Sequence, residues 1–344
     1  MVARARSWKP RHERCLSIRW ATSIPPVTER ILDLSECPAK LRVRYSQLVI
    51  EREHTEAVSL PLAEVAVVLV SHPQASLTQA VLAGLAAAGG ALVACDGASM
   101  PVGMMLPLAG HHVQAARFAA QARSPLPVRK RLWKQIVRAK VRAQGAVLAE
   151  LVGADHGLAA LSARVGSGDP ANVEARAARR YWKALFGEGF RRLRQRPDEN
   201  LLLNYGYAVL RAIVGRAICA AGLHPSLGVH HHHRGNAFCL ADDLMEPFRP
   251  IVDRAVVQSL RQGIISPIAE DDGRPRFELT PEVKRAQVAP LIGRVILDGQ
   301  QTTLFAAASA AAASLAAVFL GESDRLVLPD LTRPPIVPSL APDE

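Results

Sequence analysis

The sequence predicts an α+β multidomain fold, in which a small N-terminal β-rich domain precedes a larger all-α C-terminal domain. Short apolar or alternating runs, typical of strands, fill the first third of the chain, and apolar residues at helical spacing fill the rest. The 344 residues are 49% hydrophobic and 21% charged, as in an ordinary globular chain long enough for two domains.

The β-rich domain is expected over residues 29–110. Apolar and polar residues alternate around Ser46-Gln47 in the segment 41–53, which predicts a β-hairpin. Residues 77–90 end at a glycine pair and predict a short helix. Further strands are expected at RILDL (30–34), AVSLPL (57–62), VAVVLVSH (65–72), ALVACD (91–96) and PVGMMLPL (101–108). Of these, VAVVLVSH is apolar enough to be buried on both faces of a sheet.

Helices are expected over residues 111–328. The pair Asp169-Pro170 favours a helix start, and Gly187 favours the end of that helix. The expected helices span 128–153, 169–187, 200–222, 243–262, 281–299 and 302–321. The last is rich in alanine and could be mistaken for a membrane span, but alanine barely favours lipid and hydroxyl side chains dilute the segment further. We therefore expect a tightly packed core helix and no membrane contact.

Residues 1–28 are expected to be a disordered basic extension, and residues 329–344 a C-terminal tail. The first fourteen residues carry five Lys or Arg but no apolar run, which excludes a signal peptide. A basic arm that touches DNA is the alternative. The five cysteines are odd in number and widely scattered, so we interpret them as reduced core thiols of a cytoplasmic protein.

The net charge is +11, from 42 Lys plus Arg against 31 Asp plus Glu. Such an excess favours a polyanionic partner, most often nucleic acid, although a membrane surface is possible. Residues 128–142 concentrate the charge without a single acid, which favours contact with DNA phosphates over a solvated helix face, where the signs usually mix. We assign DNA contact to Arg129, Lys130, Arg131, Lys134, Arg138, Arg179 and Arg180, and the run Arg191, Arg192, Arg194 and Arg196 adds to the positive field.

The segment 227–250, LGVHHHHRGNAFCLADDLMEPFRP, combines four adjacent histidines with Asp243 and Glu246. A separation of three residues places both carboxylates on one side of a helix. Two carboxylates and one imidazole suit Mg²⁺ or Mn²⁺, the ions that phosphodiester chemistry uses, better than zinc. The spacing is equally consistent with a helix N-cap at Asp243 and a capping box closed by Glu246, just before Pro247.

Glu174 is the only acid between Asp169 and Glu188. By itself it predicts no more than a surface glutamate that pairs with an arginine five or six positions later.

Three segments carry a resemblance to a known family. They are SGDPANVEARAARRYWKALFG, NLLLNYGYAVLRA and LHPSLGVHHHHRGNAFCLADDLMEPFRPIVD, and they resemble the CRISPR-associated spacer-acquisition integrases (the Cas-one family), in the variant of the type II systems. SHPQASLTQAVLAGLAAAGGALVACD and PVGMMLPLAGHH resemble the N-terminal half of that family. The similarity extends from about residue 29 to residue 328.

The resemblance implies a metal-dependent DNA endonuclease and integrase that joins the 3′-hydroxyl ends of captured DNA fragments to a CRISPR repeat by transesterification. It places the catalytic metal ligands on Glu174, His231 and Glu246, with Asp243 as a further acid near the ion, and it implies Mg²⁺ or Mn²⁺ as cofactor. The β-rich domain would serve dimerisation and partner contacts, and residues 111–328 would be the catalytic domain.

The implied partners are double-stranded DNA, a second copy of the chain, and a dimer of the small Cas-two protein, which together would form a heterohexamer. Two other functions remain open from the sequence. One is a repair nuclease acting on branched DNA, which the same chemistry would permit, and the other is a non-catalytic DNA-binding scaffold. The carboxylates beside a basic surface disfavour the scaffold.

Overall fold

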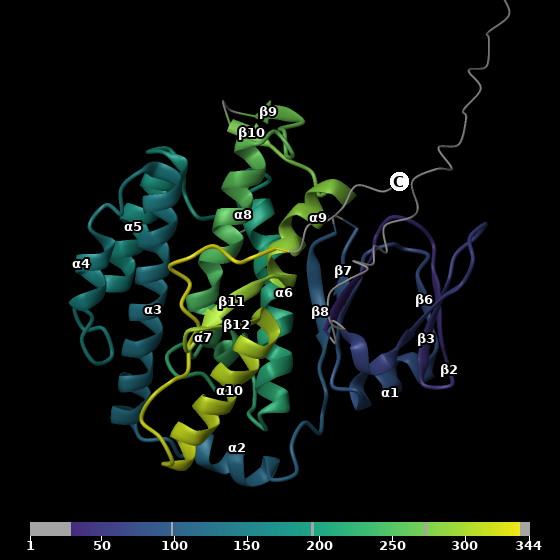
Figure 1. The fold of residues 1–344 in the computed structure, drawn as a ribbon, viewed down its shortest axis with the longest axis horizontal. Helices are drawn as coiled ribbons and strands as arrows, with labels where there is room; N and C mark the ends of the chain where they lie inside the picture. Colours follow the sequence, from purple (N-terminus) through teal and green to yellow (C-terminus); the bar gives the residue numbers. More distant parts are fainter. Residues whose placement is uncertain (1–28, 98, 194–195, 272–273, 338–344) are drawn as a thin grey trace, which may run out of the picture.

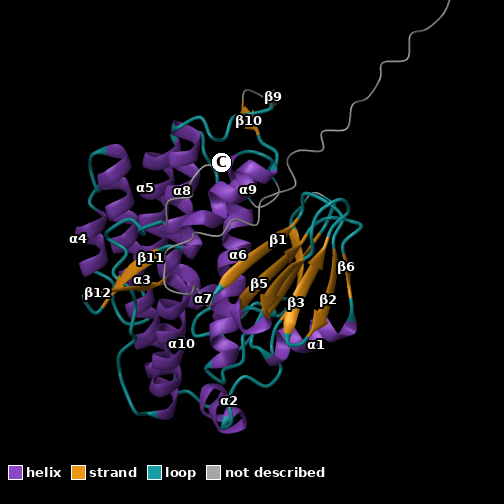
Figure 2. Cartoon of the chain, turned by 45° about the vertical axis from the view of Figure 1, so that its right-hand side comes forward, coloured by secondary structure: helices purple, strands orange, loops and turns teal. Residues whose placement is uncertain are grey.

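The computed structural model describes residues 29–97, 99–193, 196–271 and 274–337, so the predicted basic extension, Cys15 and Arg194 lie outside the described residues. The predicted order is confirmed: a β-rich N-terminal region precedes a helical region (Figures 1 and 2).

Two four-stranded sheets form the N-terminal region. The first has the order β1 (Arg30–Leu34), β5 (Val65–Val70), β7 (Ala91–Cys95) and β8 (Pro101–Met105), with only β8 antiparallel to its neighbour. The second has the order β4 (Val58–Pro61), β3 (Gln47–Glu51), β2 (Lys40–Arg44) and β6 (Ser76–Leu77). Helix α1 (Gln79–Ala87) connects the parallel strands β5 and β7, as parallel pairing requires.

The predicted hairpin forms, one residue earlier than expected. Its two turn residues are Tyr45 and Ser46, with φ angles of 50° and 59°, and Val43 pairs with Leu48. Positive φ at both central residues is the mark of a type I′ turn, whose twist matches that of the strands.

Strand β5 is buried on both faces, as its apolar run predicts. Val65 and Val68 pack into the core of the N-terminal region, whereas Ala66, Val67 and Leu69 belong to the core of the helical region. One face of the first sheet therefore packs against the N-terminal core, and the other face packs against the helical region.

The helical region surrounds α6 (Glu199–Ala220), which lies at the centre of the molecule beside the first sheet (Figure 1). By length and composition α6 could cross a membrane, but 72% of its apolar window is buried inside the molecule. The other helices are α2 (Gln114–Ala122), α3 (Leu126–Val152), α4 (Leu158–Ala163), α5 (Val173–Phe186), α7 (Cys239–Met245), α8 (Arg249–Arg261), α9 (Pro281–Val288) and α10 (Leu304–Leu320). The alanine-rich α10 packs on α6, which confirms the predicted core helix.

The helical region differs from the sequence expectation in several places. The helix expected over 243–262 begins earlier and is interrupted by the 3-10 turn η2 (Glu246–Phe248), because Pro247 and Pro250 cannot donate the backbone hydrogen bonds of a regular helix. The helices α2 and α4 are short and were not expected.

The segment 281–299 is not one helix. After α9 and the 3-10 turn η3 (Ala289–Ile292), strands β11 (Arg294–Leu297) and β12 (Gln300–Thr303) pair around Asp298-Gly299, whose φ angles of 48° and 80° again give a type I′ turn. A second hairpin joins β9 (Ala269–Asp271) and β10 (Arg274–Arg276), and the chain later returns to β11 at Asp330 and Ile336.

Candidate catalytic and nucleic-acid-binding site

Two acidic side chains converge on a single ammonium group where α3 faces α5 and η2. The Nζ atom of Lys140, on α3, lies 2.6 Å from Oε1 of Glu174 and 2.6 Å from Oε2 of Glu246. The Lys140 and Glu246 side chains are almost fully buried, and the Glu174 side chain is a quarter exposed. The structure therefore brings together two acids that lie far apart in the sequence and that the resemblance assigned to catalysis.

Glu174 is held in place by the capped start of α5. The Asp169 carboxylate accepts hydrogen bonds from the backbone N–H groups of Val173 and Glu174, both at 2.9 Å. Asp169 thus marks the helix start that the sequence predicted, although the first helical residue is Val173. The expected pairing of Glu174 with Arg179 or Arg180 is wrong, because its partner is Lys140 from another helix.

Glu246 is held by two cations. Arg249, one turn later, donates from Nη1 to Oε1 at 2.7 Å, and Lys140 approaches the other oxygen. Burial alone would raise the pKa of the Glu246 carboxyl, but Arg249 and Lys140 outweigh it and hold the pKa below its usual range. Glu246 is thus kept as a buried carboxylate anion.

Asp243 organises the histidine loop. Its carboxylate is fully buried inside α7, and Oδ2 accepts hydrogen bonds from the backbone N–H groups of Val229 at 2.6 Å and His230 at 2.8 Å. Oδ1 lies 2.5 Å from Nδ1 of His231. The capping interpretation of Asp243 and Glu246 is therefore wrong, because Asp243 binds a loop instead of the start of its own helix.

The loop approaches α7 closely at Gly228. A Cβ atom there would lie 3.1 Å from Cβ of Cys239 on α7 and 2.3 Å from the carbonyl oxygen of His231 in the loop itself, so only glycine fits. The hydrogen bond to Asp243 raises the pKa of the His231 imidazole above 6.5, although burial opposes it.

The four histidines point in different directions, as expected for neighbours in an irregular segment. His230 stacks on Trp133 of α3 with ring centroids 4.1 Å apart, and His231 meets the same indole edge-on at 5.7 Å. His232 and His233 line a pocket beside the site. Of the four, His231 is the one whose ring is held by the Asp243 carboxylate, and the charges of Glu246 and Glu174 add to the rise of its pKa that Asp243 causes.

The donor set can be tested for a divalent ion. Within the described part of the chain, no three His, Cys, Asp or Glu side chains already form a metal-binding group. Two carboxylates nevertheless converge on one cation, and that cation is the Lys140 ammonium. Two carboxylates that share one positive charge would suit Mg²⁺ or Mn²⁺ if the ion took the place of the Lys140 ammonium. The Asp243 oxygens already accept backbone and imidazole hydrogen bonds, so Asp243 fits an orienting role better than that of a ligand.

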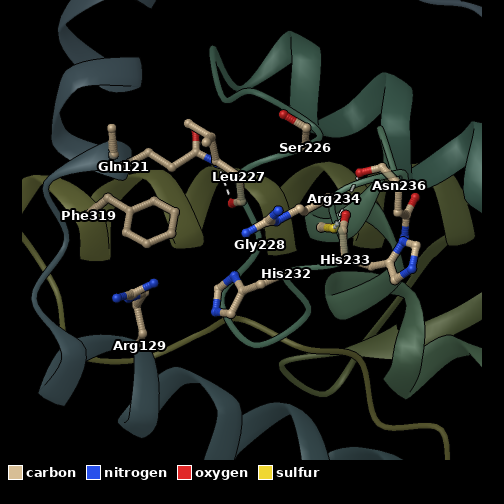
Figure 3. A pocket seen from close by; sticks show the side chains of 12 residues that line it. Gln121, Arg129, Ser226, Leu227, Gly228, His232, His233, Arg234, Asn236 and Phe319 are labelled. Carbon is tan, nitrogen blue, oxygen red and sulfur yellow. Dashed lines mark hydrogen bonds between the residues drawn. The ribbon is translucent and has the colours of Figure 1, made fainter.

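A basic pocket of about 340 Å³ adjoins the histidine loop. Figure 3 shows Arg129, His232, Arg234 and the ring of Phe319 around one hollow. Gln121 contributes to the wall while its amide bonds backbone groups of His224 and Leu227. The pocket thus combines cationic groups with an apolar ring, which suits a nucleotide better than a bare anion.

The remaining residues predicted to contact DNA lie mostly at the surface. Lys130, Arg131, Arg138, Arg179 and Arg180 are exposed, and Lys134 is half-buried. Because Lys130, Lys134 and Arg138 are four residues apart, they form one stripe along α3.

Two members of the basic runs serve other purposes. Lys140 is buried between two acids, and the Arg192 guanidinium bonds the Asn200 and Asn204 side chains at 2.7 and 2.6 Å. The Lys140 ammonium and the Arg192 guanidinium therefore do not form part of the positive surface that the two basic runs predicted.

Sequence reasoning missed several residues that build the site: Lys140 as a carboxylate partner, Arg249, Trp133 and Gly228. Only Arg249 left a usable signal, since a cation three residues after Glu246 lies on the same side of a helical turn.

A pair of converging carboxylates with an oriented histidine, beside a basic surface and pocket, is typical of enzymes that cleave or join nucleic-acid strands. The model of the family of CRISPR-associated protein Cas1 matches residues 34–289. The CRISPR-associated endonuclease Cas1 of Neisseria meningitidis serogroup C (strain 8013) is 36% identical over 271 residues, which are 78% of this chain and 85% of that protein. The chain therefore belongs to the Cas1 family.

Solved structures share the fold. A casposase bound to its integration product superimposes with a TM-score of 0.72 at 21% identity, covering 89% of this chain and 94% of the casposase. A Cas6-RT-Cas1–Cas2 complex gives a TM-score of 0.67 at 20% identity, over 88% of this chain and 36% of that longer chain.

Proposed function

We propose that this protein is a metal-dependent DNA endonuclease and integrase of CRISPR adaptation, which joins the 3′-hydroxyl ends of captured DNA fragments to the CRISPR repeat. The observation that carries the proposal is the convergence of Glu174 and Glu246 on one cation, next to the oriented His231. Support also comes from the endonuclease name of the meningococcal relative and from the casposase bound to an integration product.

The reaction is a transesterification at phosphorus. The 3′-hydroxyl oxygen of the fragment forms a bond to a repeat phosphorus and loses its proton to solvent. The bond from that phosphorus to the neighbouring 3′ oxygen breaks, and this oxygen takes up a proton to become a new 3′-hydroxyl. One phosphodiester bond replaces another, so the step needs no energy source.

Glu174, His231 and Glu246 would hold Mg²⁺ or Mn²⁺ in this proposal. Such an ion stabilises charge on the phosphoryl oxygens and activates the attacking hydroxyl. Arg249 fixes the direction of the Glu246 carboxylate. Asp243 binds Nδ1 of His231, so the other ring nitrogen, Nε2, points away from Asp243. The ion would take the place that the Lys140 ammonium now holds between the two carboxylates.

The basic stripe and the pocket would hold the DNA. Cations along α3 and α5 would track phosphates, and the pocket lined by Arg129, His232 and Arg234 would receive the strand beside the site. We further propose that the chain forms a homodimer and assembles with a dimer of Cas2 into a heterohexamer. The Cas1–Cas2 complex of similar fold supports the partnership with Cas2.

The experiment that tests the proposal compares Glu174→Ala and Glu246→Ala with wild type for joining a labelled duplex to a repeat-bearing plasmid in Mn²⁺. Both variants should lose strand transfer while they keep DNA binding, because the cations bind DNA and the carboxylates support the chemistry. Strand transfer near the wild-type rate would refute the site. Nicking of branched DNA without joined products in wild type would indicate the repair nuclease instead, and wild-type binding with neither product would indicate the scaffold.

A further inference from the structure

A further carboxylate, Asp253, lies deep in the core behind the proposed site. Its side chain is 1% exposed, and it accepts hydrogen bonds from the hydroxyl groups of Tyr181, at 2.8 Å, and Tyr207. Burial raises the pKa of Asp253 to about 6, although both hydroxyls oppose the rise. A buried ionisable group of this kind is costly, so its place in the architecture calls for a reason.

The bond between Tyr181 and Asp253 joins the two segments of the site about two helical turns beyond the two glutamates. Tyr181 follows Glu174 by seven residues on α5, and Asp253 follows Glu246 by seven residues on the run from η2 into α8. Seven residues are close to two full helical turns. Tyr181 therefore lies on the same side of its helix as Glu174, and Asp253 lies on the same side as Glu246. The hydrogen bond therefore ties together the two segments that carry the catalytic acids.

Tyr207 connects Asp253 to Glu246 by a second route. The Arg249 guanidinium lies over the Tyr207 ring, 4.6 Å from its centroid, and donates to Glu246 at 2.7 Å. The α6 backbone approaches α8 closely here, because a Cβ atom at Gly206 would lie 2.4 Å from Cγ1 of Val252. The ring is thus fixed between Asp253 and Arg249.

We propose that Asp253 is a positioning residue, which through Tyr181 and Tyr207 sets the separation of the Glu174 and Glu246 carboxylates and the direction of Arg249. It thereby determines how tightly the site binds Mg²⁺ or Mn²⁺. Asp253 itself touches neither the ion nor DNA. This inference rests on the proposed function, because it assigns the ion to those two acids.

The test measures Mn²⁺ binding to the full-length protein by calorimetry. Tyr181→Phe and Tyr207→Phe each remove one hydroxyl and keep the ring, and each should weaken Mn²⁺ binding about 10-fold, as losses behind metal ligands commonly do. Tyr205→Phe is the matched control. Tyr205 is also buried on α6, but its hydroxyl faces Asp33 of β1, 3.4 Å away, so Mn²⁺ affinity should not change.

A second pair of variants separates positioning from core stability. Asp253→Asn keeps one oxygen acceptor, and its amide NH2 can donate to the oxygen of the other tyrosine, so both contacts can persist. Asp253→Leu keeps the branched shape with a larger volume and loses both bonds. The asparagine variant should retain most of the Mn²⁺ affinity, and the leucine variant should lose at least as much as the tyrosine variants. In strand transfer, the loss should appear as a higher Mn²⁺ requirement and should be recovered at saturating Mn²⁺. If the leucine variant does not fold, the two tyrosine variants decide the question.

Wild-type Mn²⁺ affinity in both tyrosine variants would overturn the inference, because Asp253 would then only stabilise the core. An asparagine variant as weak as the leucine variant would overturn it as well, since the hydrogen bonds would not be the cause. Failure of the proposed function looks different: wild type itself would join DNA without binding Mn²⁺.

Discussion

The Nδ1 atom of His231 lies 2.5 Å from Oδ1 of Asp243. The other Asp243 oxygen holds the backbone N–H groups of Val229 and His230, so one buried carboxylate orients both the loop and the imidazole. A histidine fixed at one ring nitrogen presents the other in a defined direction, which is the usual arrangement behind a metal-binding imidazole.

This pair predicts a dependence on pH. Asp243 raises the pKa of His231 above 6.5 in the folded protein, so the charged imidazole stabilises the fold. That stability is fully present below pH 6.5 and is lost as the pH rises through the higher, folded-state pKa. Chemical denaturation of metal-free wild type and His231→Gln should therefore show a larger advantage of wild type at pH 5.5 than at pH 8. An advantage that grows with pH would contradict the assigned direction.

The histidines are expected to differ in importance. His231→Ala should abolish strand transfer, because the variant loses the only imidazole that Asp243 holds beside the two acids. His233→Ala is the matched control and should lose much less, because His233 lies in the pocket wall. The measurement is joining of labelled duplex to repeat-bearing plasmid in Mn²⁺. An inactive His230→Ala protein together with an active His231→Ala protein would move the ligand by one residue.

Lys140 is expected to compete with the ion. Lys140→Met leaves two carboxylates without their shared cation, so the metal-free protein should lose roughly 3 kcal/mol of unfolding free energy. Mn²⁺ should then bind more tightly and restore more stability than it does in wild type. Denaturation with and without Mn²⁺ measures both effects, and Lys134→Met on the same helix is the control. Weaker Mn²⁺ binding in Lys140→Met would mean that Lys140 holds the carboxylates ready for the ion.

The basic stripe on α3 should carry part of the DNA affinity. Replacing Lys130, Lys134 and Arg138 together by glutamine should weaken binding regardless of DNA sequence and flatten the plot of log K against log salt by about 0.9 per lost phosphate contact. The same change at Lys40, Arg42 and Arg44 on β2 removes equal charge from the N-terminal sheet and should leave the slope unchanged. Equal slopes in both triple variants and wild type would assign the α3 stripe to solvent or to a protein partner.

Local patterning was sufficient for most of the architecture. The apolar run of β5 predicted burial on both faces, and the spacing of apolar residues predicted α3, α5, α6 and α10, because these patterns depend on neighbours along the chain. The β11–β12 hairpin was missed although Asp298-Gly299 is a local turn signal, since apolar residues on either side also fit a helix. Pro247 was likewise a local signal for the break at η2, although a continuous helix was expected over 243–262.

The sequence by itself determined the two-part architecture, the basic character and, through the resemblance, the candidates Glu174, His231 and Glu246. Only the tertiary structure decided their partners. Lys140 meets Glu174 across 34 residues of sequence, although it belongs to the basic run that the sequence predicted to contact DNA, because the packing of α3 places it inside the protein. The reason is physical: periodicity records which side of a helix is apolar, whereas a polar contact between helices depends on how they pack, which no local pattern encodes.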